Sequence, residues 1–291
     1  MTGRSKVSLT EFIDLLACPD CGRGVSRDDN VRCPGCKRTF EILDGICVDL
    51  MPAKKFARRR GGVVENRSID CYNRLFDEPF RRVEDPSPWG LSVPENYRKK
   101  LKKHIYMLNK LIPEHIGSFC DISAGSGRFS WEIAVKSKTA VLCDISVDSV
   151  CYLTKKSIEK KRTNIFIARC DYLKPPFKKD IFDVVLCNDT LISGRDHEKK
   201  LLAAIYDVLR PGGSAILDFA YLYHRGFWHL PHSVAYSRRE MIDMLEETGF
   251  RVDKYLPLYH ELSNDPEEKR VTSKLLKCIL PPTRYIFRVF K

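Results

Sequence analysis

One stretch decides the fold of this chain: Phe119-Cys120-Asp121-Ile122-Ser123-Ala124-Gly125-Ser126-Gly127. Its apolar run ends in an acid and continues with small residues, which is typical of a buried strand that turns tightly into a helix. Gly125 and Gly127 have no Cβ, so backbone N–H groups at the start of that helix can approach a polar ligand. The next apolar run ends in Asp144, 19 positions after Gly125. Nucleotide-binding folds place the acid that holds ribose hydroxyls at about this spacing, so the pattern indicates a nucleoside-containing cofactor.

Strand-like and helix-like segments alternate along most of the chain. The expected strands are 119–121, 139–144, 164–170, 182–187, 214–219, 250–256 and 285–290, and the expected helices are 94–112, 127–137, 146–161, 196–209 and 237–247. Such alternation produces a parallel sheet with both faces covered, whose ligand site lies at the carboxyl ends of the strands. The sequence therefore predicts an α/β fold with a doubly wound, mostly parallel seven-stranded sheet. Asp121, Asp144, Asp171 and Asp189 should lie at its ligand edge.

Four cysteines near the N-terminus form two closely spaced pairs, Cys18 with Cys21 and Cys33 with Cys36. The spacing within each pair lets two thiolates of one turn face the same ion, and the 11 residues between the pairs suffice for a hairpin that brings both turns together. We expect a structural Zn²⁺, because four thiolates leave no open coordination position for chemistry. Cys47 is expected to be a small buried hydrophobe and not a fifth ligand.

Composition favours a soluble globular protein with a large domain and a small one, since the 291 residues are 43% apolar. No export signal or membrane span is visible, so we expect a cytoplasmic location. The twelve cysteines fit a reducing compartment with a metal site better than a disulfide framework. The net charge of +12 is spread along the chain. Basic clusters within 54–60, 98–103 and 155–162 could contact RNA or form ordinary solvated surfaces.

Residues 115–290 resemble the class I S-adenosylmethionine-dependent methyltransferases. The resemblance rests on Asp121-x-x-x-Gly125-x-Gly127, on Asp144 and Asp171 at strand ends, on Phe182-Asp-Val-Val before the fourth strand end, and on Leu209-Arg-Pro-Gly-Gly213 before the fifth strand. A dinucleotide site is less favoured, because Ser130 stands where the third glycine of that fingerprint belongs. The resemblance implies an enzyme that uses S-adenosyl-L-methionine.

The same resemblance implies roles for particular residues. The implied cofactor-binding residues are Asp121, Ser123, Ala124, Gly125, Gly127, Asp144, Ile145, Asp171, Tyr172 and Asn188. The loop from Ser123 to Gly127 would pass under the methionine and ribose, and Asp144 would accept hydrogen bonds from the ribose. Asp171 would bind the adenine amino group between Ile145 and Tyr172, and Asn188 would flank the methyl donor. Ser123 departs from the family, which usually has glycine at this position.

The N-terminal cysteine region resembles the small zinc-ribbon proteins that partner tRNA, rRNA and release-factor methyltransferases. The shared pattern is Leu15-Leu-Ala-Cys-Pro-x-Cys-Gly, a second Cys-Pro-x-Cys, Asp44-Gly-Ile and Val48-x-Leu-Met-Pro. Its order before a methyltransferase-like region also resembles the rRNA guanine-N1 methyltransferases. We therefore expect a zinc-ribbon domain at 1–52, a basic linker and lead-in at 53–93, and a methyltransferase domain at 94–291.

The sequence does not determine the methyl acceptor, and three functions of different classes remain open. A small-molecule or lipid-like acceptor is slightly preferred, because an aromatic segment follows the fifth strand and residues 236–250 are similar to those of many small-molecule methyltransferases. The ribbon and the basic clusters favour an rRNA or tRNA base instead. Asn188-Asp189-Thr190-Leu191 lacks the Pro-Pro-aromatic motif of enzymes that methylate amino groups of bases, which counts against exocyclic adenine or cytosine. Only Ser123 favours a non-catalytic binding module.

A general base is needed only if the acceptor must lose a proton early in the reaction. The weak candidates for a catalytic role are His224, His229, His232 and Asp189. The three histidines lie among aromatic residues where a substrate lid is expected, so they could equally contribute packing.

Overall fold

The computed structural model describes residues 9–27, 30–51, 95–191, 193–221, 235–259 and 281–291. Nine strands of these residues form one sheet in the order β11-β12-β10-β9-β6-β7-β8-β5-β4. Seven of these strands belong to the part of the chain that begins at Ser118. They are β6 (Ser118–Asp121), β7 (Thr139–Asp144), β8 (Ile165–Arg169), β9 (Phe182–Leu191), β10 (Leu209–Ala220), β11 (Arg251–Leu258) and β12 (Arg284–Phe290). Strands β6 to β10 pair in parallel, and β12 is antiparallel to both β10 and β11. The predicted mostly parallel α/β architecture is confirmed, but the sheet has nine strands and not seven, because β5 pairs with β8 and β4 pairs with β5.

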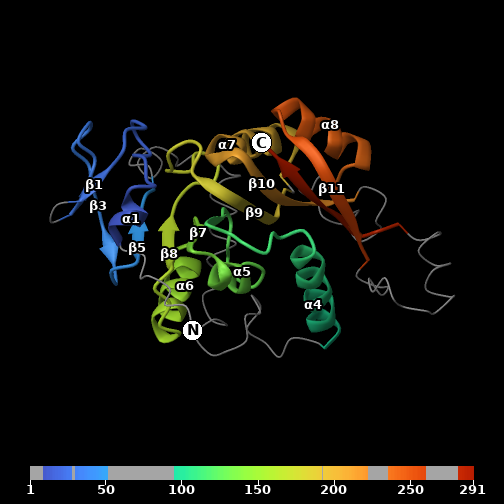
Figure 1. The fold of residues 1–291 in the computed structure, drawn as a ribbon, viewed down its shortest axis with the longest axis horizontal. Coiled ribbons are helices and arrows are strands. Elements are labelled where there is room, and N and C mark those ends of the chain that lie inside the picture. Colours follow the sequence, from blue (N-terminus) through green and yellow to red (C-terminus); the bar gives the residue numbers. More distant parts are fainter. Residues whose placement is uncertain (1–8, 28–29, 52–94, 192, 222–234, 260–280) are drawn as a thin grey trace, which may run out of the picture.

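Helices cover both faces of this sheet (Figure 1). The first face carries α4 (Glu95–Asn109), α5 (Trp131–Lys136) and α6 (Val147–Glu159), and the second carries α1 (Leu9–Ile13), α7 (Arg195–Val208) and α8 (Arg238–Thr248). Successive strand residues point to opposite faces, so Phe119 packs in the first core and Cys120 in the second. No helix in the described part of the chain combines the length and the apolar character needed to cross a bilayer.

Local signals set the helix ends as expected. The Ser146 side chain accepts a hydrogen bond from the Ser149 N–H before α6, and Ser237 forms a capping box with Glu240 before α8. Helix α8 ends at Gly249, whose φ of 102° lies in the left-handed region. The helix expected at 127–137 is shorter than predicted and begins at Trp131, because the chain first turns through Gly127 at a φ of 73°.

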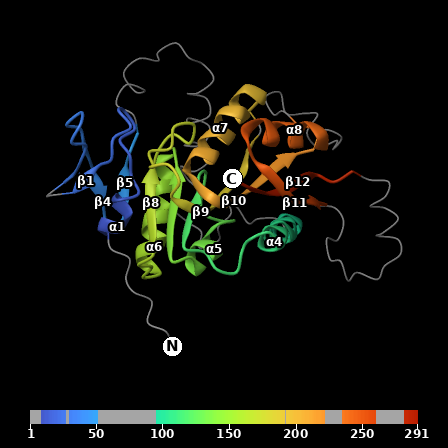
Figure 2. The ribbon, with the colours of Figure 1, turned by 45° about the horizontal axis from the view of Figure 1, so that its top comes forward.

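The N-terminal unit, defined here as residues 9–27 and 30–51, contributes to two sheets. Strands β1 (Ser26–Arg27), β2 (Val31–Arg32) and β3 (Thr39–Phe40) form a small antiparallel sheet. The hairpin of β4 (Ile42–Leu43) and β5 (Cys47–Asp49) instead joins the large sheet, where β5 pairs in parallel with β8. Figures 1 and 2 both show the unit beside β8, at the opposite end of the sheet from β11.

Candidate functional site

The glycine-rich loop lies where the strand order reverses. The chain runs from β6 to β7 and β8 on one side and then returns to β9 on the other, and ligands of doubly wound sheets bind at such a point. Gly125 and Gly127 have φ angles of 55° and 73°, which glycine adopts at little cost. A Cβ on Gly125 would meet nothing within 4 Å, whereas one on Gly127 would lie 2.9 Å from Leu153 Cδ2. Open space therefore lies above Gly125, and close packing lies behind Gly127.

Three acids follow the loop strands, and each accepts a hydrogen bond from the backbone N–H two residues later. The nitrogen-to-oxygen distances are 3.2 Å from Ser123 to Asp121, 2.8 Å from Ser146 to Asp144 and 3.1 Å from Leu173 to Asp171. This side-chain turn is a common conformation of aspartate. It fixes the three carboxylates at the carboxyl edge of β6, β7 and β8, and all three are buried.

Asp144 also accepts a hydrogen bond from the Gly125 N–H, at 2.7 Å. One carboxylate therefore fixes both the glycine loop and the turn after β7. Burial raises the pKa of Asp144, and burial raises the pKa of Asp121 to about 7.

Tyr172 and Ile145, the expected walls of a base-binding pocket, are held by neighbouring elements. The Tyr172 hydroxyl lies 3.2 Å from His197 Nε2 on α7. The Ile145 carbonyl accepts a hydrogen bond from Arg169 Nε at 3.2 Å. Both side chains are partly buried. Ile145 directly follows Asp144 in the sequence, and Tyr172 directly follows Asp171. The first contact holds the Tyr172 side chain, and the second holds the backbone at Ile145.

Asn188 differs from these acids because its side chain lacks partners. It is 5% exposed, and neither its Oδ1 nor its Nδ2 has a hydrogen-bond partner among the described residues. A buried polar group without a partner costs about 1–3 kcal/mol. Asn188 therefore presents two hydrogen-bonding atoms near the carboxyl end of β9 that no described residue uses.

A network of charged side chains, which the sequence pattern did not predict, lies beside Asn188; Asp218 and Arg284 are buried, whereas Asp189 is 35% exposed. Asp189 contacts Arg128 at 2.8 Å and Arg284 at 3.0 Å, and its N–H donates to Asp218 Oδ1 at 2.7 Å. Arg284 Nε lies 2.5 Å from Asp218 Oδ2, and His104 Nε2 lies 3.5 Å from the same oxygen. These residues come from α4, the glycine loop, β9, β10 and β12. No sequence spacing could have predicted this cluster, because its residues come from four helices and strands and one loop that are far apart in the chain.

The two acids of this network are perturbed in opposite directions. Burial alone would raise the pKa of Asp189, but Arg284 and Arg128 outweigh burial and hold that pKa well below its usual range. Burial raises the pKa of Asp218 to about 6, although Arg284 opposes the rise. A carboxylate as acidic as Asp189 is a weak proton acceptor, so the geometry favours Asp189 as the partner of two arginines over Asp189 as a base. The candidates His224, His229 and His232 lie outside the described residues.

Comparison with known proteins identifies the central part of this sheet. Residues 119–213 match the family model described as "Methyltransferase domain". This match covers about a third of the chain, which is therefore similar to methyltransferase domains in its central part. The matched range begins at Phe119 in β6 and ends at Gly213 in β10, so it includes the glycine loop, the three acids and Asn188. No curated protein sequence matches the chain significantly.

Solved structures share the fold of this methyltransferase at low sequence identity. Magnesium protoporphyrin IX methyltransferase of Synechocystis is 15% identical with a TM-score of 0.53, covering 78% of this chain and 99% of that one. N-methyltransferase NodS of Bradyrhizobium japonicum is 14% identical with a TM-score of 0.52, covering 75% and 98%. Phosphoethanolamine N-methyltransferase 2 of Haemonchus contortus is 15% identical with a TM-score of 0.53, covering 76% and 60%. At this identity the similarity confirms the fold.

Ser123, the residue at which the methyltransferase pattern usually has glycine, contacts the next strand of the site. Its Oγ lies 2.5 Å from Thr190 Oγ1, and Thr190 Oγ1 also donates to the Asn188 carbonyl at 3.1 Å. The hydroxyl therefore joins the loop after β6 to the end of β9. Its hydroxyl has a partner within the protein, so a serine in place of glycine leaves no unpaired hydroxyl at this position of the glycine loop.

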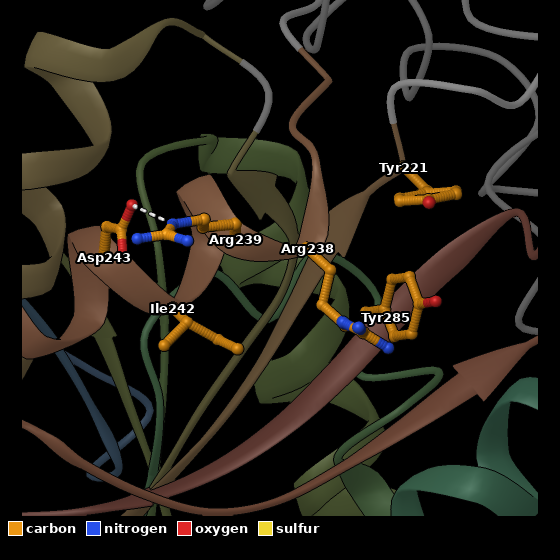
Figure 3. Close-up of a pocket in the computed structure, with 6 residues that line it drawn as sticks. All are labelled: Tyr221, Arg238, Arg239, Ile242, Asp243 and Tyr285. Atoms are coloured by element: carbon orange, nitrogen blue, oxygen red, sulfur yellow. Dashed lines mark ion pairs between the residues drawn. The ribbon is translucent and has the colours of Figure 1, made fainter.

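A pocket of about 440 Å³ opens on the methyltransferase where β10 ends, β12 begins and α8 begins (Figure 3). Its lining residues are Tyr221, Arg238, Arg239, Ile242, Asp243 and Tyr285. Arg239 forms an exposed ion pair with Asp243, at 3.9 Å. Among the described residues Arg238 forms no ion pair, and its guanidinium carbon lies 5.6 Å from the centre of the Tyr255 ring. The pocket thus combines aromatic walls with Arg238, a cation for which the described part of the chain supplies no carboxylate partner.

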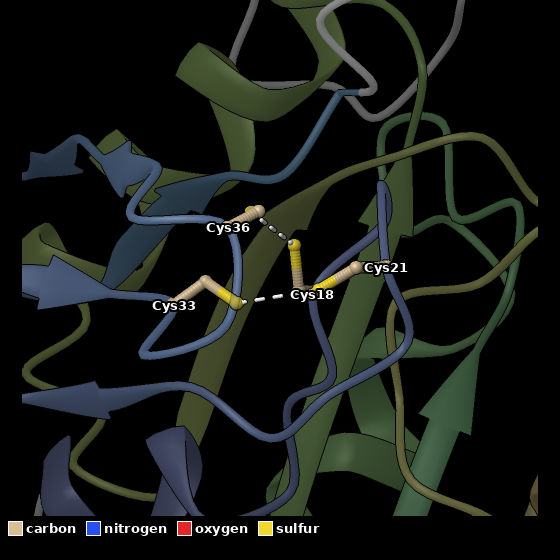
Figure 4. A group of neighbouring side chains, drawn as sticks. All are labelled: Cys18, Cys21, Cys33 and Cys36. Carbon is tan, nitrogen blue, oxygen red and sulfur yellow. Dashed lines mark hydrogen bonds between the residues drawn. The ribbon is translucent and has the colours of Figure 1, made fainter.

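The four predicted metal-binding cysteines lie together in the N-terminal unit (Figure 4). Their sulfur atoms all lie within 4.8 Å of one another, with 3.5 Å between Cys18 and Cys36 and 3.4 Å between Cys21 and Cys33. Thiolates around a tetrahedral zinc lie ~3.8 Å apart, because each Zn–S bond is ~2.3 Å long. The arrangement therefore fits zinc. Cys47 is buried in β5 and is not part of this group.

Proposed function

We propose that the methyltransferase domain transfers the methyl group of S-adenosylmethionine to a small-molecule acceptor with an anionic group. The observation that carries this proposal is the pocket beside Arg238. Its volume of about 440 Å³ lies within the range of small-molecule sites. The pocket opens beside Tyr221, directly after the carboxyl end of β10, so it lies on the ligand edge that also carries Asn188 at the end of β9.

The cofactor would occupy the other half of this edge. We assign the ribose hydroxyls to Asp144 and the adenine amino group to Asp171, with Ile145 and Tyr172 on either side of the base. Asp121 and the loop from Ser123 to Gly127 would hold the methionine part. Asn188, with both of its buried amide atoms unpartnered, would lie beside the methyl donor and gain hydrogen bonds on binding.

Methyl transfer from a sulfonium is an in-line displacement, so alignment of the acceptor with the methyl group can supply much of the rate acceleration. The residues assigned to the cofactor and those that line the pocket would bind and orient the two reactants. Arg238 would pair with the acceptor's anion, while Tyr221 and Tyr285 would enclose its apolar part. An acceptor with a free lone pair needs no proton acceptor before the displacement.

The experiment compares methyl incorporation from labelled S-adenosylmethionine into a small-metabolite extract and into total RNA. We expect label in the metabolite fraction. Once the acceptor is identified, Arg238→Ala should raise its KM at least tenfold, because a charge-assisted contact is lost. Arg239→Ala is the matched control, since its charge is already paired with Asp243, and should change KM less than twofold. Label that enters RNA alone would contradict the proposal.

A second candidate function, methylation of an rRNA or tRNA base, is favoured by one surface. The C-terminal half of α6 and the turn after it carry Lys155, Lys156, Lys160, Lys161 and Arg162. The Lys156 ammonium lies 4.3 Å from the centre of the Trp131 ring, a basic and aromatic combination that suits nucleic acid. RNA bound through this surface would dissociate steeply with added salt. Binding that is absent or insensitive to salt would exclude this candidate.

We further propose that Cys18, Cys21, Cys33 and Cys36 bind a structural zinc ion. The two turns that carry them have the same backbone hydrogen bonds: Gly22 N–H to the Cys18 carbonyl at 2.8 Å, and Lys37 N–H to the Cys33 carbonyl at 3.0 Å. The ion would stabilise the N-terminal unit and supply no open position for chemistry. Metal analysis of the purified protein should give one zinc per chain, and Cys33→Ser should lower that content.

A further inference from the structure

The N-terminal unit packs directly against the half of the site assigned to the adenine. Strand β5 pairs with β8 in the register Cys47 with Ile167 and Asp49 with Arg169, so the paired segment ends two residues before Asp171. The Leu50 N–H donates to the Arg169 carbonyl at 2.8 Å. The ring of Phe12 stacks on that of Phe166, with 4.7 Å between the centroids.

The loop after Asp171 is also bonded to this unit. The Ala17 N–H donates to the Pro176 carbonyl at 2.8 Å, and the Lys178 N–H donates to the Leu15 carbonyl at 2.9 Å. Ala17 directly precedes the first cysteine of the metal-binding group. Two backbone hydrogen bonds therefore join the segment just before the first cysteine turn to the loop that follows Asp171.

One side chain joins the two parts. Arg169 donates from Nη1 to Asp49 Oδ2 at 2.9 Å and from Nε to the Ile145 carbonyl at 3.2 Å. Asp49 belongs to the N-terminal unit, and Ile145 is the proposed wall of the adenine pocket, directly after Asp144. The guanidinium is 17% exposed, so solvent weakens these contacts only partly.

We propose that Arg169 is a positioning residue for the adenosine part of the cofactor, and that the N-terminal unit sets cofactor affinity through Asp49 and Arg169. This inference rests on the proposed cofactor site. The N-terminal unit thereby acts on the methyltransferase by holding both sides of the adenine pocket, namely Ile145 through Arg169 and the loop after Asp171 through Ala17. Metal binding at the cysteines and cofactor binding are then coupled, and each strengthens the other.

The test measures Kd for S-adenosylhomocysteine by calorimetry on the full-length, metal-containing protein. Arg169→Met should raise Kd about tenfold, and Asp49→Asn should raise it about threefold. Arg169→Lys should recover part of the loss, because one charged contact remains possible. The same variants should weaken adenosine binding by similar factors while kcat at saturating S-adenosylmethionine stays within twofold. A general loss of folding would lower kcat as well.

The other end of the sheet supplies a matched control. Arg288 on β12 has the same kind of contacts, with Nε 2.7 Å from Asp253 Oδ2 and Nη1 3.3 Å from the Leu111 carbonyl. Arg288→Met should leave Kd within twofold. Equal effects of Arg169→Met and Arg288→Met, or an unchanged Kd in a folded Arg169→Met protein, overturn the inference. Wild-type protein that fails to bind S-adenosylhomocysteine would instead refute the proposed cofactor site itself.

Metal removal gives an independent measurement of the same coupling. Treatment of the wild-type protein with a chelator should raise Kd for S-adenosylhomocysteine at least threefold, and added zinc should restore it. The Arg169→Met protein should respond less, because its link between the two parts is already broken. A Kd that is indifferent to metal content in a protein whose zinc has been shown to leave overturns the coupling.

Discussion

The two halves of the ligand edge are built in different ways. On the side of β6, β7 and β8, each acid is fixed by a backbone N–H two residues later, and the contacts are local in sequence. On the side of β9, β10 and β12, Asp189 and Asp218 are fixed by arginines from distant parts of the chain, with Arg284 95 residues after Asp189. The first half is determined by short sequence patterns, and the second exists only once the whole sheet has formed.

The largest expected effect falls on the second half. Arg284→Met should lower the free energy of unfolding by about 3–5 kcal/mol at pH 7, because it leaves Asp218 buried without its main compensating charge. Urea denaturation measures the change. The double variant Arg284→Met/Asp218→Asn should recover part of the loss, since it removes the uncompensated charge. A loss below about 1 kcal/mol would mean that the network contributes little to folding.

The free energy of unfolding should depend on pH through Asp218 and Asp189. The raised pKa of Asp218, about 6 against an ordinary 3.8, means that the folded protein binds the proton more tightly than the unfolded chain. Its contribution to stability is full below pH 3.8 and is lost as the pH rises through about 6. Asp189, with a lowered pKa, contributes in the opposite sense and loses its contribution in acid. Asp218→Asn should therefore flatten the fall in stability between pH 4 and pH 6.

On the side of β6, β7 and β8, substitution of an acid should weaken cofactor binding. Asp144→Ala should raise Kd for S-adenosylhomocysteine about 100-fold, because charged hydrogen bonds worth about 1.5–3 kcal/mol each hold Gly125 and Ser146 in place. Calorimetry measures the change. Asp144→Asn keeps one acceptor oxygen and should give an intermediate value. If both variants bind like the wild type, the proposed ribose contact is wrong.

Asp121 gives a smaller effect that depends on pH. Burial raises its pKa to about 7, and a cationic ligand beside it favours the ionised form. Affinity for S-adenosylmethionine should therefore rise with pH up to and through 7, by at most about tenfold per pH unit, and level off above. The stability of the unliganded protein follows the reverse trend and falls as the pH rises through 7. Asp121→Asn should remove the pH dependence of Kd, which titrations at pH 6, 7 and 8 would reveal.

The smallest expected effect lies where the two halves meet. Ser123→Gly removes the contact between Ser123 Oγ and Thr190 Oγ1, and a neutral hydrogen bond contributes only about 0.5–1.5 kcal/mol. Kd for S-adenosylhomocysteine should change by no more than about threefold, and Thr190→Val should give a similar value. A much larger loss in either variant would show that this contact, and not the separate construction of each half, sets the geometry of the edge.

The same contrast explains what the sequence could predict. Ser146, Ser237 and Gly249 act within a few residues of their own position, so the helix ends they set could be recognised directly. The cysteine turns and the glycine loop are similarly local. The Arg284 network and the pairing of β5 with β8 depend on how the elements pack in space, so no periodicity or spacing reveals them. The assignments of individual cofactor residues and of the domain boundaries stay predictions.

The place of β5 in the large sheet has a consequence for the order of folding. Cys47 pairs with Ile167, so strand β5 meets its neighbour only after a further 120 residues have been synthesised. At ~5–20 residues per second this takes about 6–24 s. During that time the edge of β5 that will pair with β8 has no partner, although its other edge can already pair with β4. Docking of β5 on β8 is then a late step of folding, in which a hairpin that is synthesised early joins a sheet whose other strands are synthesised after it.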